Sequence, residues 1–352
     1  MLWLNNSRFV LPQVEAATGP DSPSYLPESG YELAVVDCAG EPFTELVLSW
    51  NADTPAGTGL HTEVRVRYGP VDGPPESGTW SDWQPLGHWG REGAEGAHRP
   101  HSQLNGADHA APLKVVIDVL QLDEGVEAAA FQLRLTLYGG AASPEVRLLA
   151  VSTAHRGRPT LDAAHDPPLG REIRLSVPAR SQRVERPEIA GEICSPTSLS
   201  MVLQFYGIDE PTEQVAEAVY DHGAEIYGNW PFNVAYAGSH GLRAVVRHFR
   251  GMGEIERELH RGHPVIVSIA FQLGELPESP TQGTRGHLLV VTGVTAAGDF
   301  HVNEPDAHPA EGEPVERIYS REGLRRAFLG HSAIGYVIEP AGESLAAPAG
   351  RP

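Results

Sequence analysis

A cysteine stands directly before an expected helix in the C-terminal half of the chain. Cys194 is followed by Ser195-Pro196-Thr197 and then by a largely apolar run to position 206. Proline is favoured at the start of a helix, so Pro196 predicts a helix over 195–206 with Cys194 at its N-cap. Free N–H groups and the macrodipole there favour an anion, and thiolate is the reactive form of cysteine. Cys194 is therefore our candidate nucleophile, although free cysteines are also common as small buried residues.

A histidine further along the chain could serve as the base for this thiol. His287 begins a predicted strand over 287–294 and follows Gly286, a residue that lets another backbone approach. A turn at 296–299 leads to a second strand over 300–303, which predicts a hairpin. Because the two arms of a hairpin are adjacent, the end of the second strand comes back beside His287. We expect His287 to be the general base.

The second arm of this hairpin ends in the acidic sequence Asn303-Glu304-Pro305-Asp306. One of its side chains can orient the imidazole, as the third member of a catalytic triad does. Side chains alternate along a strand, and proline breaks the ladder and carries Asp306 into the loop. We therefore favour Glu304 as the orienting acid, with Asp306 and Asn303 as alternatives.

Other elements of the C-terminal half indicate the α+β class, because helices come first and strands follow. Predicted helices cover 195–206, 212–220, 231–237, 254–261 and 320–328, and predicted strands cover 265–269, 287–294, 300–303 and 334–338.

The N-terminal half alternates between apolar and polar residues with period two, between turns rich in Gly and Pro. This pattern predicts short half-buried strands and an all-β sandwich. The strands are expected at 43–50, 62–68, 113–120, 131–138 and 146–151. We divide the chain into an N-terminal segment (1–30), the sandwich (31–153), a Pro- and Gly-rich linker (154–176), the α+β domain (177–340) and a tail (341–352).

In combination, these motifs resemble cysteine peptidase family thirty-nine, the bacteriocin double-glycine leader peptidase-like members of the papain-like clan, and in particular their free-standing bacterial branch. The matching motifs are Gln182, Cys194-Ser195-Pro196-Thr197, Gly228-Asn229-Trp230-Pro231-Phe232-Asn233, Gly286-His287 and Val302-Asn303-Glu304-Pro305. The resemblance implies a papain-like cysteine peptidase fold over 177–340. Where the family usually has Asn-Asp-Pro, this chain has Asn-Glu-Pro, with a longer acid.

Carried over to these positions, the resemblance also implies site roles. Cys194 would be the nucleophile, His287 the general base and acid, and Glu304 the acid directly before the proline. Gln182 would donate to the oxyanion. Asn229, Trp230 and Phe232 would line the substrate cleft.

Tryptophans of the N-terminal half carry a second resemblance, to the region that accompanies the peptidase in that branch. They lie in Leu48-Ser49-Trp50-Asn51 and in Trp80-Ser81-Asp82-Trp83 through Trp89. Tryptophan combines a large apolar body with one polar group. These residues fit either core packing or a platform for a glycan or a peptide.

Composition excludes several classes of partner. The net charge of −20 repels phosphate, which argues against nucleic acid and anionic membrane surfaces. No apolar run of membrane-spanning length and no signal peptide is recognised, so membrane insertion is not expected and the cytoplasm is the default location, with export left open. Two cysteines are too few for a disulfide framework. His98, His101 and His109 lack a completing carboxylate, so we expect no metal and no organic cofactor.

The sequence therefore predicts thiol-dependent hydrolysis of a peptide or related amide in a peptide or protein substrate. Two other classes stay open. One is acyl transfer on the same triad, and the other is a binding protein with a decayed active site that uses the sandwich.

Overall fold

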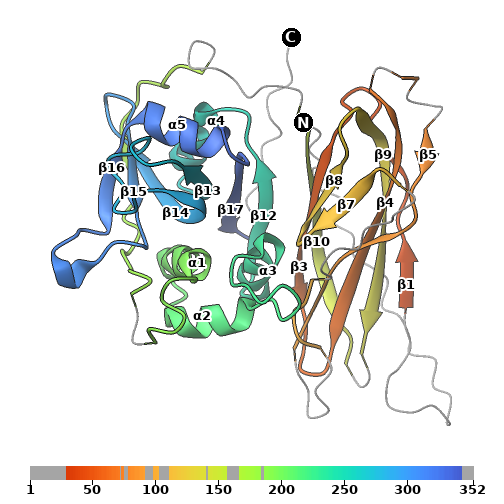
Figure 1. Cartoon of the computed structure of the whole chain (residues 1–352). Coiled ribbons are helices and arrows are strands. Elements are labelled where there is room, and N and C mark those ends of the chain that lie inside the picture. Colours follow the sequence, from red (N-terminus) through yellow and green to blue (C-terminus); the bar gives the residue numbers. More distant parts are fainter. Residues whose placement is uncertain are drawn as a thin grey trace. The chain divides into compact units, whose positions relative to one another are not determined.

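The computed structural model describes residues 29–342 apart from 72, 75–77, 92–97, 103–110, 140–141, 157–165 and 184–185. The described residues form two compact units (Figure 1). Unit 1 comprises 29–156 together with Tyr220–Ser239, and unit 2 comprises 166–219 and 240–342. The segment Tyr220–Ser239 thus belongs with unit 1, although it lies inside the predicted α+β domain.

Unit 1 contains two antiparallel sheets. One has the order β1-β9-β4-β5, with β2 on β9 and β6 on β4, and the other has the order β10-β3-β8-β7. The strands are β1 (Ser29–Glu32), β2 (Val36–Asp37), β3 (Glu45–Asp53), β4 (Gly59–Pro70), β5 (Thr79–Trp80), β6 (Gln84–Gly90), β7 (Leu113–Val116), β8 (Val119–Leu122), β9 (Val126–Tyr138) and β10 (Glu145–Ala154). The apolar positions of the alternating runs form the core, with Leu46, Leu48, Trp50, Val64, Val66 and Phe131 at most 2% exposed.

The predicted strand over 113–120 is in fact two strands, and that prediction was wrong. β7 and β8 pair with each other through Val116 and Val119, so Ile117 and Asp118 form a two-residue turn. Ile117 adopts a φ of 60°, a conformation that β-branched residues rarely take. Such turns are normally signalled by Asn or Gly. The missing signal explains why the run was interpreted as one strand.

Helix α3 (Trp230–Ser239) packs on β3 of unit 1. The ring of Phe232 is fully buried, with its centroid 6.1 Å from that of Trp50 and 5.6 Å from that of Trp89. The N–H of Trp230 donates to Asp118 Oδ2 at 2.8 Å. Apolar packing and a helix-start hydrogen bond therefore both fix this segment in unit 1.

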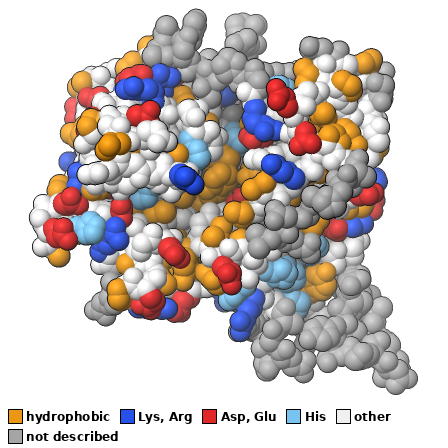
Figure 2. Space-filling view, viewed as in Figure 1, with side chains coloured by type: hydrophobic (Ala, Val, Ile, Leu, Met, Phe, Trp, Pro, Cys, Tyr) orange, Lys and Arg blue, Asp and Glu red, His pale blue; other side chains and the backbone are white. Residues whose placement is uncertain are grey.

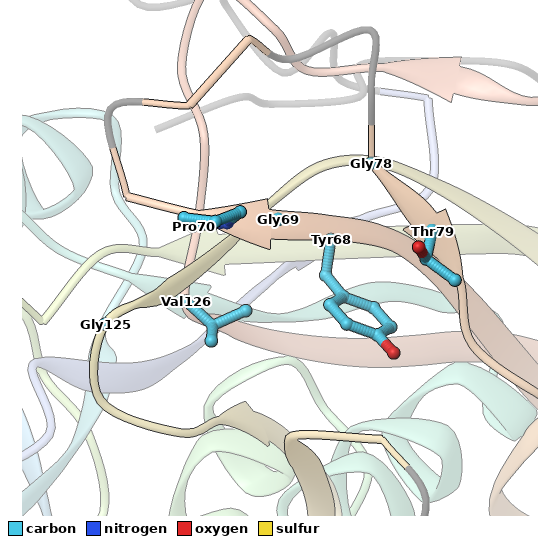
Figure 3. A pocket seen from close by; sticks show the side chains of 7 residues that line it. All are labelled: Tyr68, Gly69, Pro70, Gly78, Thr79, Gly125 and Val126. Atoms are coloured by element: carbon cyan, nitrogen blue, oxygen red, sulfur yellow. The ribbon is translucent and has the colours of Figure 1, made fainter.

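A cavity of about 310 Å³ lies at one end of the β4–β5 and β4–β9 pairings in unit 1 (Figure 3). Its lining residues are Tyr68, Gly69, Pro70, Gly78, Thr79, Gly125 and Val126. This lining offers two hydroxyl groups and backbone atoms, and no carboxylate, imidazole or thiol.

Unit 2 is built on one sheet with the order β12-β17-β13-β14-β15-β16, with β11 on β14 (Figure 1). Its strands are β11 (Ile173–Arg174), β12 (Leu242–His248), β13 (Val265–Phe271), β14 (Thr284–Val294), β15 (Phe300–Asn303), β16 (Glu316–Tyr319) and β17 (Ile334–Pro340). The helices are α1 (Cys194–Phe205), α2 (Thr212–Val219), α4 (Met252–His260) and α5 (Arg321–Leu329), with a short 3₁₀ helix, η2 (Pro309–Glu311). The four predicted strands and the predicted helices are confirmed to within about two residues at most ends, the usual uncertainty of such boundaries.

Part of the expected linker over 154–176 is built into unit 2. Residues 157–165 lie outside the described part of the chain. Asp166 accepts hydrogen bonds from the N–H groups of Met252 and Gly253 and so caps α4, and β11 pairs with β14. Unit 2 therefore already includes 166–176.

Acidic and basic side chains are interspersed on the face shown in Figure 2. Ion pairs among the described residues include Arg186 with Glu217 and Arg325 with Glu322. On this face the net charge of −20 is therefore not gathered into one acidic surface. Among the described residues, no helix is both long enough and apolar enough to cross a membrane.

We predict that Phe232→Ala lowers the free energy of unfolding by about 3–5 kcal/mol, because it leaves a cavity between Trp50 and Trp89. Urea unfolding followed by tryptophan fluorescence measures the change. Phe232→Leu is the matched control and should cost clearly less, because it fills most of the cavity. An Ala variant as stable as the original chain would contradict the packing described here.

Candidate active site

Helix α1 carries Cys194 at its first residue, one position later in the helix than expected. The helix begins at Cys194 with Ile193 as its cap, so Pro196 lies in the first turn, where a missing N–H costs nothing. The first intrahelical bond runs from Thr197 N–H to Ile193 O at 2.9 Å. The N–H of Cys194 precedes it and has no acceptor within the helix.

The helix that carries the thiol is buried along its length rather than amphipathic, with Ser195 to Leu203 all buried. Its hydroxyl groups tie it to the sheet of unit 2. Ser198 Oγ donates to Leu288 O at 3.1 Å, and Ser195 Oγ and Tyr336 OH are 2.9 Å apart. The first bond holds α1 against β14, one residue beyond His287, and the second holds it against β17.

His287 is the fourth residue of β14, and a β-bulge directly precedes it. Ile269 pairs with His287 but Phe271 pairs with Thr284, so β14 contains one extra residue between these two pairs. Bulges of this kind re-aim side chains beside active sites. A Cβ on Gly286 would meet no atom within 4 Å, so the expected close approach of another backbone at this glycine is wrong.

Glu304 reaches His287 across the hairpin of β14 and β15. Val290 pairs with Asn303, so the same register places Glu304 opposite Leu289, two residues from His287 and therefore on the same face. Diagonal neighbours of this kind are within reach of long side chains. The result is a contact of 2.5 Å between His287 Nε2 and Glu304 Oε1.

The carboxylate of Glu304 is fully buried and accepts hydrogen bonds on both oxygens. Oε1 accepts from His287 and from the N–H of Asp306, the latter at 2.9 Å. Oε2 accepts from Tyr319 OH at 2.7 Å. Three donors thus fix the carboxylate in one orientation.

The imidazole of His287 bridges Glu304 and Cys194. It forms hydrogen bonds with both side chains, and because Nε2 faces Glu304, Nδ1 is the nitrogen left for the thiol. Burial lowers the pKa of His287, but the Glu304 carboxylate and the Cys194 sulfur outweigh it and hold the pKa well above its ordinary value. The site therefore favours a charged imidazolium beside the Glu304 carboxylate.

The pKa of Glu304 shifts in the opposite direction to that of His287. Burial raises the pKa of Glu304, but the positive charge of His287 and the hydrogen bonds from His287, Tyr319 and the Asp306 N–H outweigh it and lower the pKa overall. Burial, and then the charge of Glu304, raise the pKa of Tyr319. Tyr319 therefore stays a neutral donor.

The other two residues of the acidic sequence lie elsewhere. Asn303 Nδ2 donates to the carbonyls of Val177 and Pro178 at 3.1 and 3.3 Å. Asp306 Oδ1 accepts from Gln182 Nε2 at 2.9 Å, and the N–H of Gln182 donates to Pro305 O at 2.7 Å. The structure thus brings Cys194, His287, Glu304 and Gln182 into one hydrogen-bonded region of unit 2.

The three residues expected to line the cleft belong to unit 1. Asn229 is buried, and its Nδ2 donates to Asp221 Oδ2 at 2.9 Å while its Oδ1 accepts from the N–H of Phe232 at 3.1 Å. Trp230 is half-buried, and Phe232 lies in the core described above. Asn229 and Phe232 thus have structural roles within unit 1, and the role of all three residues in a cleft stays a prediction.

The tryptophans considered as a platform fall into two groups. Trp50 and Trp89 are 1% and 4% exposed and pack in the core. Trp80 and Trp83 are half-buried, and the guanidinium carbon of Arg65 lies 5.1 and 4.7 Å from their ring centroids. Cation–π contacts thus already engage both half-buried rings.

Tyr319 is the site residue that the sequence interpretation missed. It ends β16, a strand that was not predicted. The only available signal was a single aromatic residue directly before Ser320, which caps α5 and accepts from Gly323 N–H.

The two cysteines of the chain are Cys38 and Cys194. Both thiols are free, and burial with the nearby charge of Asp37 raises the pKa of Cys38 to about 11. In the described ranges no three or more His, Cys, Asp or Glu side chains gather into a metal-binding group. His109, one of the three histidines considered above, lies outside those ranges.

Two family models match the chain. The Peptidase_C39 like family matches residues 174–329, and the Peptidase C39 N-terminal domain matches residues 28–154. The chain carries a Peptidase C39-like domain preceded by a Peptidase C39 N-terminal domain. The resemblance to cysteine peptidase family thirty-nine stated above is confirmed.

Solved structures share less with this chain. A double glycine motif protease from an AMS/PCAT transporter, crystallised with the leader peptide, is 21% identical, covers 48% of this chain and 94% of its own, and has a TM-score of 0.34. A protein described as a C39-like peptidase from Bacillus anthracis is 16% identical, covers 49% and 99%, and has a TM-score of 0.37. A search of curated proteins finds no match.

We predict that the Glu304–His287 pair stabilises the fold in a defined pH window. The raised pKa of His287 contributes stability that is complete below its ordinary value of 6.5 and is lost as pH rises through the folded value. The lowered pKa of Glu304 contributes stability that is complete above its ordinary value of 4.5 and is lost as pH falls through the folded value. Glu304→Gln should therefore lower the free energy of unfolding most near pH 5.5, and less at pH 9.

Chemical denaturation at the two pH values measures this difference. Glu316→Gln is the matched control, because Glu316 is an exposed acid on β16 that pairs only at the surface with Arg174, and it should change stability little at either pH. A loss in Glu304→Gln that is larger at pH 9 than at pH 5.5 would show that the pair is not charged in the folded protein.

Proposed function

We propose that this protein is a cysteine peptidase that hydrolyses a peptide bond with Cys194, His287 and Glu304. The observation that carries the proposal is the buried hydrogen-bonded series from the thiol through the imidazole to a fully buried carboxylate. A buried carboxylate held by three donors is an arrangement suited to orienting a histidine. Membership of a peptidase family supports the same activity.

The proposed reaction uses this series in two steps. His287 takes the thiol proton of Cys194, and the thiolate attacks the carbonyl carbon of the peptide. The C–N bond then breaks as His287 returns the proton to the leaving amine, which leaves a thioester on Cys194. His287 next takes a proton from water, whose oxygen attacks the thioester, and the carboxylic acid product leaves as the thiol is restored.

Charge that develops on the carbonyl oxygen needs donors. The N–H of Cys194 has no acceptor within α1. We assign Gln182 Nε2 as the second donor, on the basis of the family resemblance and of the hydrogen bonds that anchor Gln182 to the turn after Glu304. Asn229 and Phe232 are fully buried in unit 1, and the cleft role that the resemblance implies for them and for Trp230 stays a prediction.

The finer fold assignments belong to the same proposal. The two antiparallel sheets of unit 1 support a β-sandwich. In unit 2, a buried helix that presents the cysteine at its N-terminus against an antiparallel sheet that carries the histidine and the acid supports a papain-like fold.

We predict that Cys194→Ala abolishes peptide hydrolysis and that His287→Ala lowers kcat by about 10³-fold or more, because each removes a reacting group. Release of a fluorophore from a library of short fluorogenic peptides measures the rate. Cys38→Ser is the matched control and should keep the original rate, because Cys38 is buried in unit 1.

Alkylation separates the two thiols without a substrate. Iodoacetamide at pH 6 should label Cys194 much faster than Cys38, as read by peptide mapping, because Cys38 is 1% exposed and burial raises its pKa to about 11. Equal labelling of both thiols, or hydrolysis that survives Cys194→Ala, would overturn the nucleophile assignment.

A further inference from the structure

Asp306 is the acid of the sequence Glu304-Pro305-Asp306 that does not contact His287. Its carboxylate instead binds three side chains: Gln182 Nε2 at 2.9 Å and the guanidinium of Arg183 on Oδ1, and the hydroxyl of Thr281 on Oδ2. Its own N–H donates to Glu304 Oε1 at 2.9 Å. One residue therefore touches both the acid of the proposed triad and the proposed oxyanion donor.

Gln182 is held on the same turn by its main chain and its side chain. It is 2% exposed, and its N–H donates to Pro305 O at 2.7 Å. Its Oε1 is buried and finds no hydrogen-bond partner among the described residues. Nε2 therefore has a charged hydrogen-bond acceptor in Asp306. Oε1 has no hydrogen-bond donor among the described residues.

An amide side chain can present either end by rotating half a turn. With Nε2 toward Asp306, one N–H satisfies the carboxylate and the second N–H of the same nitrogen remains for another acceptor. With the amide reversed, Oε1 would face Oδ1, two acceptors without a proton between them, in a buried place where such an arrangement is costly. The charge on Asp306 thus selects one of the two orientations.

We propose that Asp306 is a positioning residue that fixes the amide orientation of Gln182, so that Gln182 always presents an N–H to the developing oxyanion. This inference rests on the proposed function, in which Gln182 is that donor. An oxyanion donor stabilises the transition state only if it is aimed before the reaction begins. A reversed amide would present an oxygen to the negative charge instead. Glu304 orients the base, and Asp306 orients the amide, from opposite sides of one proline.

The kinetic test compares Asp306→Ala, Asp306→Asn, Gln182→Ala and the double variant Gln182→Ala/Asp306→Ala on one fluorogenic peptide. Asp306→Ala should lower kcat by about 10- to 100-fold with little change in KM, up to the loss caused by removing an oxyanion donor altogether. Asp306→Asn should be intermediate, because its carbonyl can still accept from Nε2 while its own N–H₂ can also donate to Oε1. In the double variant, the loss should equal that of Gln182→Ala alone.

Two controls separate positioning from general support of the fold. Arg183→Ala removes another partner of Asp306 and leaves the Gln182 bond in place, so it should keep kcat within about twofold of the original. The rate at which iodoacetamide alkylates Cys194 needs no oxyanion donor and should be unchanged in Asp306→Ala. Losses that multiply in the double variant, an unchanged kcat in Asp306→Ala, or slower alkylation of Cys194 in that variant would each overturn the inference.

A spectroscopic readout keeps this test independent of activity. In protein labelled with ¹⁵N-glutamine, the side-chain signals of Gln182 are assigned by their absence in Gln182→Ala. Their hydrogen exchange with water should be at least about tenfold faster in Asp306→Ala than in the original chain, because a buried hydrogen bond to a carboxylate is lost. Unchanged exchange would overturn the inference even if the chain hydrolyses no peptide, whereas faster exchange without any hydrolysis would count against the proposed function alone.

Discussion

The hydrogen bond between His287 and Glu304 sets the conditions that the rest of unit 2 must meet. Both side chains are buried, and removing two opposite charges from water costs several kcal/mol per ion unless the pair is close and its remaining polar atoms are satisfied. The distance of 2.5 Å meets the first condition. Tyr319 OH and the N–H of Asp306 meet the second, since they occupy the other acceptor positions of the carboxylate.

This requirement explains elements that look unrelated to catalysis. β16 is short and carries the charged residues Glu316 and Arg317, yet the hydroxyl of its last residue, Tyr319, donates to Glu304. The turn at Pro305 and Asp306 supplies the N–H to the same carboxylate and also accepts the main-chain N–H of Gln182. Ser181 Oγ donates to Ala307 O at 2.7 Å and strengthens the same connection. The segment that enters α1 is therefore anchored on the far end of the hairpin that carries His287 and Glu304.

The sequence predicted those parts of the site in which local chain geometry determines contact. His287 and Glu304 are 17 residues apart on the arms of one hairpin, and alternation, the position of proline and the family resemblance together favoured Glu304 over its neighbours. Glutamate has one methylene more than the aspartate that is usual in the family. The longer side chain suits the diagonal distance between positions 287 and 304. Tyr319 could not be predicted, because its strand consists of four residues with mixed burial, and a tyrosine hydroxyl gives no sequence signal of its partner.

Other parts of the fold could not be predicted, because the same pattern of apolar and polar residues is compatible with two different structures. The run over 113–120 alternates like a single strand, and only an isoleucine at positive φ reveals the turn within it. β12 has apolar residues at most positions but three charged or imidazole side chains, and it was left unassigned. The local sequence around Trp230 and Phe232 does not distinguish aromatic residues of a substrate cleft from aromatic residues of a core. Their place depends on long-range contacts with residues such as Trp50 and Asp118, which no local window contains.

The segment Tyr220–Ser239 shows that a boundary in sequence need not be a boundary in space. It lies inside the range matched by the C39-like family, 174–329, but it packs with the unit that the N-terminal family matches, 28–154. Asp221 is fully buried and accepts from the N–H of Ser102 at 2.8 Å and from Asn229 Nδ2 at 2.9 Å, and Phe232 fills the space between Trp50 and Trp89. A buried carboxylate and a buried aromatic ring that lose these partners face large desolvation and exposure costs. The N-terminal unit is therefore completed by residues of the peptidase-like range.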